Sequence, residues 1–407
     1  MDFLILSNKM PYPPNDGGCI GVLVMIKGLK KLGHNVTVLA MNTHKHSFDV
    51  DALPDDLKEN VEWHTCYVDI SINPPDILSN LLFSQLPYNA KRFISKTYRN
   101  KLVEILKKKK FDIIHLEGLY LYPYISSIRK YSDALIAFRA PNVEQEIWKR
   151  TVRNQSPSLK RVYNRILSLR MQKFEKRSLK QFDLLVPVTD RDGYILDFLG
   201  NQSPVYVAPT GIDFDEVKIS DVSPPHNTVY FIGALDWTPN QEGLLWFIDK
   251  VWGTVLKEYP EAEFHIAGRN APPSFKHKLN KKNIIFHGSV EDAHEFVQQY
   301  NIMVSPLLTG SGMRVKLVES MALQKPIVST YVGAEGIVNV NETYMYLAHN
   351  ETEFANYLIE LLKNPEKCKM LANNARRFVE KHYNSVTIIA GLVQFYEEQI
   401  KKHKVND

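Results

Sequence analysis

The sequence contains few cysteines and no long apolar run. Cys19, Cys66 and Cys368 are its three cysteines, an odd number spread widely over 407 residues. They offer neither a disulfide framework nor the close pairs of a zinc site, and this usage is typical of a reducing compartment. No stretch approaches the about 20 apolar residues of a membrane-spanning helix. The short apolar run after Met1 lacks a basic flank, so we expect a first strand rather than a signal peptide, and a cytoplasmic protein.

The chain also lacks a strong excess of charge. It has 50 Lys and Arg residues against 45 Asp and Glu residues, a formal net charge of +5. This mild balance does not indicate a general nucleic-acid-binding protein, so no nucleic acid is expected as a partner. At this length a single hydrophobic core is insufficient, and two domains of roughly 200 residues are expected.

The residue pattern alternates short apolar strands with helical stretches in both halves. We expect strands at 3–7, 36–40, 111–115, 135–139 and 184–188, and again at 229–232, 263–267, 284–287, 302–305 and 327–330. We expect helices at 21–32, 142–180, 241–258, 291–300, 314–324 and 366–401. This alternation predicts an α/β protein with parallel, doubly wound sheets. A polar, proline-bearing segment separates the halves, which gives an N-terminal domain at 1–207, a linker at 208–227 and a C-terminal domain at 228–385.

The run from Gly310 to Ala322 combines a glycine-rich loop with the start of an apolar-periodic helix. Such a loop brings backbone N–H groups close to a ligand, and the helix start adds a partial positive charge. Arg314 and Lys316 add two full positive charges, which suits a diphosphate. Glu319 follows about one turn later, where its carboxylate can accept hydrogen bonds from sugar hydroxyls. Each residue alone would equally suit a solvated helix start, so the prediction rests on the combination.

This run, together with 233–237 and 267–270 after two earlier strands, resembles the nucleotide-sugar site of the retaining group 1, or family 4, glycosyltransferases of the GT-B fold. The resemblance implies two Rossmann-like α/β domains that face each other across a cleft. The donor would be held mainly by the C-terminal domain and the acceptor by the N-terminal domain. The resemblance also implies that a terminal helix at 386–407 crosses back onto the N-terminal domain.

The resemblance assigns donor binding to glycines of both halves and to the charged residues of the glycine-rich run. These residues are Gly17, Gly18, Gly233, Gly268, Arg269, Gly310, Ser311, Gly312, Met313, Arg314, Lys316 and Glu319. Backbone amides would face the diphosphate, Arg314 and Lys316 would neutralise its charge during catalysis, and Glu319 would hold the ribose. Because basic residues and helix dipoles can stabilise the leaving diphosphate, we expect neither a metal ion nor a cofactor beside the co-substrate.

The chain departs from the family pattern at two positions. The family commonly has a further glutamate where this chain has Ser311, and a histidine where it has Pro141. His115 is the nearest replacement for the missing histidine, and we expect His115 and Glu117 to face the cleft as catalytic residues. A histidine at a strand end equally suits a structural role.

Two further residues are expected on the acceptor side. They are Asn142 and Glu144, which follow the strand at 135–139. Glu144 would orient the acceptor hydroxyl, or it would favour the dipole at the start of a helix.

The helical region 142–180 is rich in basic residues, and a second basic cluster occupies 107–110. Apolar residues recur in it at helical spacings: Trp148, Val152, Leu159, Val162, Ile166 and Leu169. One interpretation is a core-facing stripe with a solvated basic face. The other is peripheral contact with an anionic membrane surface or with a lipid-linked acceptor.

The resemblance therefore implies a metal-independent, retaining hexosyltransferase. It would move a sugar from a nucleoside-diphosphate sugar to a hydroxyl of a glycan or a lipid-linked acceptor. The expected setting is bacterial surface polysaccharide biosynthesis, in the cytoplasm at the inner face of the membrane. One alternative is a catalytically degenerate GT-B protein that binds a glycan or a partner enzyme, which Ser311 and Pro141 favour and Glu319 disfavours. Another is a sugar-nucleotide epimerase on the same fold, which Ser311 and Pro141 disfavour.

Overall fold

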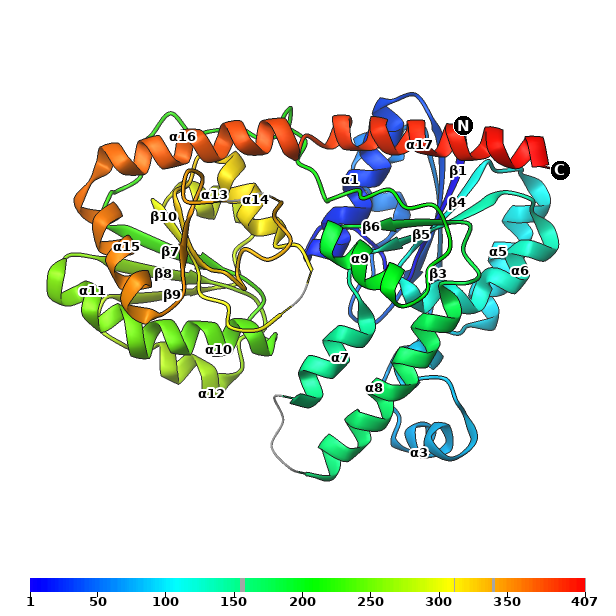
Figure 1. Cartoon of the computed structure of the whole chain (residues 1–407), viewed down its shortest axis with the longest axis horizontal. Coiled ribbons are helices and arrows are strands. Elements are labelled where there is room, and N and C mark those ends of the chain that lie inside the picture. The colour runs from blue at the N-terminus through cyan, green and yellow to red at the C-terminus, as the bar shows by residue number, and fades with distance from the viewer. Residues whose placement is uncertain (154–157, 311, 339–340, 407) are drawn as a thin grey trace. The chain divides into compact units, whose positions relative to one another are not determined.

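The computed structural model describes the chain except residues 154–157, 311, 339–340 and 407, and it divides into two compact units (Figure 1). Unit 1 contains Met1–Gly211 and Ser385–Asp407, and unit 2 contains Ile212–Asn384. The segment 208–227, predicted to be a linker, therefore contributes residues to both units. The terminal helical segment belongs to unit 1, although it directly follows unit 2 in the sequence.

Unit 1 is built on a six-stranded parallel sheet with the order β3-β2-β1-β4-β5-β6. The strands are β1 (Asp2–Ser7), β2 (Asn35–Asn42), β3 (Val61–Tyr67), β4 (Ile113–Glu117), β5 (Leu135–Ala140) and β6 (Leu184–Pro187). In this register Ser7 of β1 pairs with Glu117 of β4, and Glu117 pairs with Arg139 of β5. Polar residues from the carboxyl ends of three strands therefore lie side by side.

Unit 2 repeats this architecture, with six parallel strands in the order β12-β11-β10-β7-β8-β9. The strands are β7 (Thr228–Ile232), β8 (Glu263–Ala267), β9 (Ile284–Gly288), β10 (Ile302–Ser305), β11 (Ile327–Thr330) and β12 (Tyr346–Ala348). The predicted α/β class with two doubly wound parallel sheets is confirmed. The sequence pattern missed the edge strands β3 and β12.

Helices connect the strands, as parallel pairing requires. In unit 1 they are α1 (Gly17–Lys31), α2 (Asp55–Lys58), α3 (Pro74–Phe83), α4 (Tyr88–Lys91), α5 (Lys96–Lys108), α6 (Ile125–Tyr131), α7 (Glu144–Arg153), α8 (Leu159–Ser178), α9 (Asp190–Phe198) and α17 (Ser385–Asn406). In unit 2 they are α10 (Thr238–Trp246), α11 (Gly253–Glu258), α12 (Pro273–Lys276), α13 (Ala293–Gln298), α14 (Val315–Ala322), α15 (Glu351–Lys363) and α16 (Pro365–His382). A π-helical turn at Phe247–Trp252 joins α10 to α11. None of the described helices is long and apolar enough to cross a membrane.

The segment 366–401, predicted as one helix, forms α16 and α17, which are separated at Tyr383 and Asn384. Helix α17 packs against α1 within unit 1, where Ile389, Leu392 and Tyr396 are buried in the core. A Cβ placed on Gly28 of α1 would lie 2.1 Å from Cδ1 of Ile389. Glycine at this position therefore permits the close crossing of the two helices.

Helices α7 and α8 lie side by side as a hairpin (Figure 1). Part of the predicted helix 142–180 lies outside the described residues, at 154–157. The carboxylate of Glu175 on α8 accepts hydrogen bonds from the backbone N–H groups of Glu144 and Gln145, at 2.9 and 3.0 Å. It thereby satisfies donors that the first turn of α7 leaves open.

The apolar stripe predicted for this region does not face the core along α8. Leu159, Val162 and Leu169 are exposed. The helix instead buries Asn164, Leu167, Ser168, Met171, Phe174, Glu175 and Ser178. The core-stripe interpretation is therefore wrong for α8, because several polar residues occupy its buried face.

Candidate functional site

The sheet of unit 2 places its candidate site between β7 and β10. Strand β7 lies between β10 and β8, so the strand order changes direction there. Open α/β sheets bind ligands outside the carboxyl ends of such strands. The loop 233–237 follows β7, and the loop 306–314 follows β10. Two of the three predicted donor segments therefore meet at the expected edge of this sheet.

The glycine-rich loop leads directly into α14, which begins at Val315. Gly310 and Gly312 have φ values of +141° and +76°, which glycine adopts without the cost that a side chain adds. A Cβ on Gly310 would lie 2.1 Å from Nη2 of Arg314. Ser311 lies outside the described residues. The backbone conformation thus allows the guanidinium of Arg314 to fold back over the loop, where its Nη1 donates to the carbonyl of Gly312 at 3.2 Å.

Arg314 also reaches the loop that follows β7. Its guanidinium carbon lies 5.4 Å from the centre of the Trp237 ring, within cation–π range. The loop 233–237 contains neither Arg nor Lys, so Arg314 supplies a positive charge beside it. Trp237 ends the predicted donor segment 233–237, but the sequence analysis assigned it no role. The available signal was an aromatic residue in a loop at a ligand-binding edge, and 40% of its surface is exposed.

Three predicted charged residues converge at the start of α14. Burial lowers the pKa of Lys316, while the charge of Glu319 raises it and that of Arg269 lowers it. Lys316 and Glu319 are three residues apart and so share one face of the helix. Leu317, Val318 and Met321 are buried. Two cations and one carboxylate therefore gather here, with the core on another side of α14.

Glu319 has a neighbour that the sequence analysis missed, His294 of α13. Nε2 of His294 lies 3.7 Å from Oε1 of Glu319. The interaction with Glu319 raises the pKa of His294, against the opposite effect of burial. His294 is therefore protonated below this raised pKa, and the charged pair is lost as the pH rises through it. A histidine on a short polar helix gave no sequence signal.

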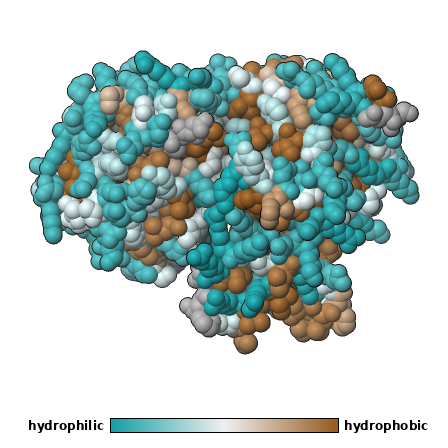
Figure 2. Space-filling view, in the orientation of Figure 1, coloured by the Kyte–Doolittle hydropathy of each residue, from teal (hydrophilic) through white to brown (hydrophobic). Residues whose placement is uncertain are grey.

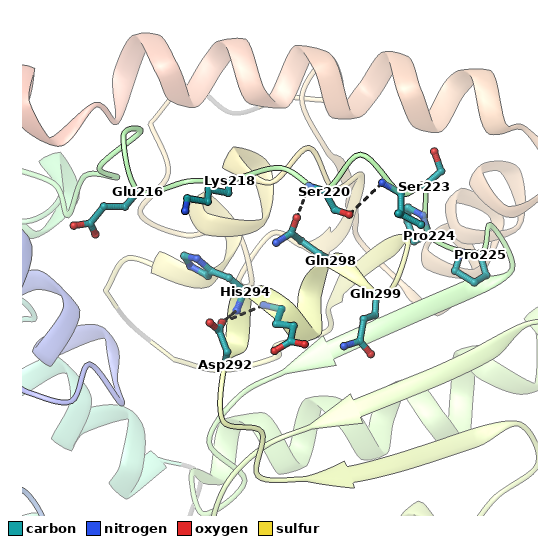
Figure 3. Close-up of a pocket in the computed structure, with 12 residues that line it drawn as sticks. Glu216, Lys218, Ser220, Ser223, Pro224, Pro225, Asp292, His294, Gln298 and Gln299 are labelled. Carbon is teal, nitrogen blue, oxygen red and sulfur yellow. Dashed lines mark hydrogen bonds between the residues drawn. The ribbon is translucent and has the colours of Figure 1, made fainter.

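A pocket of about 530 Å³ lies along α13 and the segment 216–225. Figure 3 shows His294 among the side chains at one end of this pocket, with Gln298 and Gln299 further along α13. Oε1 of Gln298 accepts a hydrogen bond from the backbone N–H of Ser220, which ties the two walls together. None of the described residues of the glycine-rich loop lines this pocket, whereas His294 lines it and also contacts Glu319.

The remaining predicted glycines of unit 2, Gly233 and Gly268, allow two loops to lie close together. A Cβ on Gly268 would lie 2.0 Å from the carbonyl oxygen of Gly233. The backbone N–H of Leu235 donates to the carbonyl of Arg269 at 2.9 Å. This close approach joins the loops after β7 and β8 and positions Arg269 near Lys316. Met313 packs against one of the apolar clusters of unit 2.

In unit 1, Gly17 and Gly18 form the start of α1. Asp16 caps this helix by accepting a hydrogen bond from the N–H of Cys19 at 2.9 Å. Oδ1 of Asp16 lies 2.6 Å from Nζ of Lys9, and Oδ2 lies 3.1 Å from Nε2 of His46. Burial would raise the pKa of Asp16, but the interactions with His46 and Lys9 outweigh it and hold that pKa below its usual range. The capping explains why α1 begins before the predicted Gly21.

Asp16, Cys19 and His46 have potential ligand atoms within 4.8 Å of one another. Two observations disfavour a cation at this place. The Lys9 ammonium already neutralises Asp16, and burial raises the pKa of the Cys19 thiol to about 11, which keeps it protonated. These side chains are better explained as a polar cap on α1.

His115 and Glu117 were expected to face the cleft, but both side chains are buried within unit 1. Glu117 forms an ion pair with Arg139, in which its Oε2 lies 3.0 Å from Nη1. Burial lowers the pKa of His115 to about 4, so its ring is neutral near pH 7. The ring of Tyr396, from α17, lies 6.2 Å from that of His115. Neither side chain is exposed to a substrate in this arrangement.

The two predicted acceptor-side residues begin α7 or directly precede it. Asn142 is half-buried. Oε2 of Glu144 accepts a hydrogen bond from the hydroxyl of Tyr120 at 2.7 Å, and burial raises the pKa of Glu144. Glu144 is thus engaged inside unit 1, and the raised pKa is the property that a proton-accepting carboxylate uses near neutral pH.

Comparison with known proteins finds similarity to a glycosyltransferase family within unit 2. The profile described as "Glycosyl transferases group 1" matches residues 226–364. A Klebsiella pneumoniae protein described as "Uncharacterized 44.6 kDa protein in cps region" is 26% identical over 400 residues, which covers 96% of this chain and 98% of that protein. No substrate is stated for it.

Two of the similar solved structures cover almost the full length of this chain. Sucrose-phosphate synthase from Thermosynechococcus elongatus superposes with a TM-score of 0.71 at 15% identity, over 99% of this chain and 100% of that one. Anabaena Alr3699/HepE in complex with UDP superposes with a TM-score of 0.66 at 14% identity, over 98% and 100%. This chain therefore has the GT-B fold, and the greater part of its unit 2 is similar to the group 1 glycosyltransferases.

Proposed function

We propose that this protein is a retaining glycosyltransferase that moves a sugar from a nucleoside-diphosphate sugar to a hydroxyl of a glycan or a lipid-linked acceptor. The part of this proposal that concerns the nucleotide-sugar donor rests on one observation. At the carboxyl edge of the sheet of unit 2, Arg269, Lys316 and Glu319 converge on the start of α14. A glycine loop with two left-handed backbone positions, at Gly310 and Gly312, leads into the same helix.

The start of α14 offers what a diphosphate needs. Open backbone N–H groups at a helix N-terminus and nearby cations bind phosphate oxygens. Arg314 and Lys316 would neutralise the negative charge that grows on the diphosphate as the glycosidic bond breaks. Burial lowers the pKa of Lys316, and a bound anion would favour its charged form again. A metal ion is not needed for this charge compensation.

Glu319 would hold the ribose, because its carboxylate accepts hydrogen bonds from paired hydroxyls. Its side chain keeps 20% of its surface exposed, so a ligand can reach it. The Trp237 ring, held beside Arg314, would contribute an apolar surface next to the phosphates. Transfer with retention would then use the departing phosphate to accept the proton of the acceptor hydroxyl on the same face of the sugar.

This route does not require a dedicated base, which suits a chain that has Pro141 and a buried His115.

The comparisons support the proposed class of donor and the proposed role in polysaccharide biosynthesis. HepE is described in complex with UDP and with UDP-glucose. The Klebsiella relative is described as belonging to a cps region, which supports a role in polysaccharide biosynthesis. A lipid-linked acceptor would bring the protein to a membrane surface.

Donor turnover in the variant Arg314→Ala tests this proposal. We expect release of nucleoside diphosphate from the matching nucleotide sugar to fall by about 10- to 150-fold, the value of one charge-assisted hydrogen bond. Nucleoside affinity should change little, because Arg314 faces the phosphates. The matched control is Arg377→Ala, which removes an exposed base from α16 in the same unit.

Unchanged turnover in Arg314→Ala would remove Arg314 from the phosphate site. A wild-type protein that binds the nucleotide but turns over no nucleotide sugar, with any acceptor or with water, would support the catalytically degenerate alternative. Ser311 and Pro141 are the residues that favour this alternative.

A further inference from the structure

An apolar surface is formed on unit 1 where α3 lies beside α8, and we name it the α3–α8 surface. Its members each have between 54 and 90% of their surface exposed: Ile72, Leu78, Leu82, Phe83, Leu159, Val162 and Leu169. Figure 2 shows apolar residues gathered at the end of unit 1 where α3 lies in Figure 1. Apolar side chains scattered singly need no explanation, but a group of this kind marks an interaction site.

The two helices are held together, so the surface is a fixed feature of unit 1. Nη2 of Arg170 on α8 donates to the carbonyl of Leu81 at 2.8 Å, and its Nη1 donates to the carbonyl of Asn80 at 3.0 Å. Asn80 in turn donates through Nδ2 to the carbonyl of Leu86 at 3.1 Å. Arg170 thereby closes the end of α3 against the middle of α8.

Basic side chains accompany the apolar ones on the outer face of α8. Leu159, Val162 and Leu169 recur at helical spacing on the side opposite to the buried Leu167 and Met171. The exposed bases of this helix are Lys160, Arg165, Lys173, Lys176 and Arg177. The one acidic residue in the sequence of α8, Glu175, is buried and caps α7. The outer face of α8 is therefore apolar and positively charged.

We propose that the α3–α8 surface docks this protein on a bilayer that contains anionic lipid. Phe83, Leu82 and Val162 would enter the boundary between headgroups and acyl chains. Arg165 and Lys173 would contact the lipid phosphates. An apolar face combined with lysine and arginine is the composition that lies in a membrane interface. The proposal deepens the proposed function, because it gives a lipid-linked acceptor a place to meet unit 1.

The charges on α8 disfavour a second copy of this chain as the partner that binds the α3–α8 surface. In a symmetric dimer through this surface, the same patch would face itself. Arg165, Lys173 and Lys176 of both copies would then lie in one interface, and α8 offers them no exposed acidic partner. An anionic bilayer supplies the opposite charge over a broad area, and the attraction weakens as salt rises.

Vesicle co-sedimentation of the full chain tests the proposal. The probe is phosphatidylcholine vesicles with and without about 30 mol % phosphatidylglycerol. We expect the wild type to bind the anionic vesicles, to bind the neutral vesicles at least about tenfold more weakly, and to be released by added salt. The double variant Phe83→Ser/Val162→Ser should bind the anionic vesicles at least about tenfold more weakly, because it removes apolar burial from both helices.

Two controls distinguish binding through the α3–α8 surface from nonspecific adsorption of the protein to vesicles. Phe198→Ser removes a phenylalanine of α9 that is 93% exposed and lies outside the surface, and it should bind like the wild type. Replacing Lys107 and Lys110 by glutamine tests the other basic cluster and should also leave binding nearly unchanged. The residues replaced in the double variant are exposed, so its thermal midpoint should stay within about 2 °C of the wild type.

Several outcomes would overturn the proposal. These are an absence of binding to anionic vesicles, equal binding to both vesicle types, or a double variant that binds like the wild type. A wild-type dimer in light scattering that the double variant dissociates would assign the surface to a second copy instead. Nucleoside-diphosphate binding, measured without vesicles on the same proteins, should be equal in wild type and double variant. Vesicle binding without nucleotide binding would refute the proposed function and leave the docking surface standing.

Discussion

Replacing Glu319 by alanine is expected to weaken nucleoside-diphosphate binding by about 10- to 150-fold, because a carboxylate that accepts ribose hydroxyls contributes about 1.5–3 kcal/mol through each such bond. The fold should stay intact. Glu319 is on the face of α14 that carries Lys316, while the core residues of that helix are Leu317, Val318 and Met321. Isothermal calorimetry gives the dissociation constant, and the thermal midpoint reports the fold.

Two further variants test whether the carboxylate of Glu319 causes the loss of nucleotide affinity. Glu319→Gln keeps the size of the side chain and removes its charge, so it should weaken binding less than alanine does. Glu295→Ala is the matched control, since this exposed carboxylate lies on α13 beside His294. It should leave the affinity unchanged. Equal affinities of Glu319→Ala and wild type would show that Glu319 is not part of the nucleotide site.

Replacing Arg139 by methionine is expected to lower the free energy of unfolding by about 3–5 kcal/mol. Arg139 and Glu117 each keep only 3% of their side-chain surface exposed. Loss of the guanidinium leaves a buried carboxylate without a counter-charge. In the wild type the buried ring of His115, whose pKa is lowered to about 4, supplies no positive charge to Glu117 near pH 7. Urea denaturation followed by circular dichroism measures the loss.

The double variant Glu117→Met/Arg139→Met distinguishes the ion pair from simple packing. It removes both charges, so we expect it to be more stable than Arg139→Met alone and to lie within about 2 kcal/mol of the wild type. If Arg139→Met does not fold, the milder Glu117→Gln provides the single-partner measurement. A loss below about 1 kcal/mol in both single variants would contradict the buried pair.

The central strands of both sheets could be predicted from the sequence because they are fully buried and apolar. The expected ranges 263–267, 302–305 and 327–330 coincide with β8, β10 and β11. Of the edge strands, β6 and β9 were predicted, but β3 and β12 gave weaker signals. β3 is half-exposed and mixes polar with apolar residues, and β12 has only three residues.

The candidate site also has a part that the sequence predicts and a part that it does not. The glycine-rich loop and the charges of α14 carry local signals, so Arg314, Lys316 and Glu319 could be selected from the sequence alone. Contacts between distant segments could not be predicted, and the contacts of Trp237 with Arg314 and of His294 with Glu319 appear only in the folded structure. The roles of these residues stay predictions until a ligand is bound.

Burial was the property that the sequence pattern predicted least well. His115 and Glu117 end a strand, where side chains often reach solvent, but Tyr396 of α17 and Arg139 of β5 pack around them. On α8 the reverse occurred. Its apolar stripe is exposed because tertiary packing uses the face that contains Asn164, Ser168 and Glu175. Periodicity shows which residues share a helix face, but it does not show which face is covered.

The most direct test of the central claim is a calorimetric titration of the wild-type protein with UDP, GDP, dTDP, ADP and CMP, each compared with its nucleoside. The claim is that unit 2 binds a nucleoside diphosphate at the start of α14. We predict that one diphosphate binds clearly, that its nucleoside binds at least about tenfold more weakly, and that added salt reduces the difference. Absence of binding to every diphosphate, or equal affinity for a diphosphate and its nucleoside, would contradict the claim.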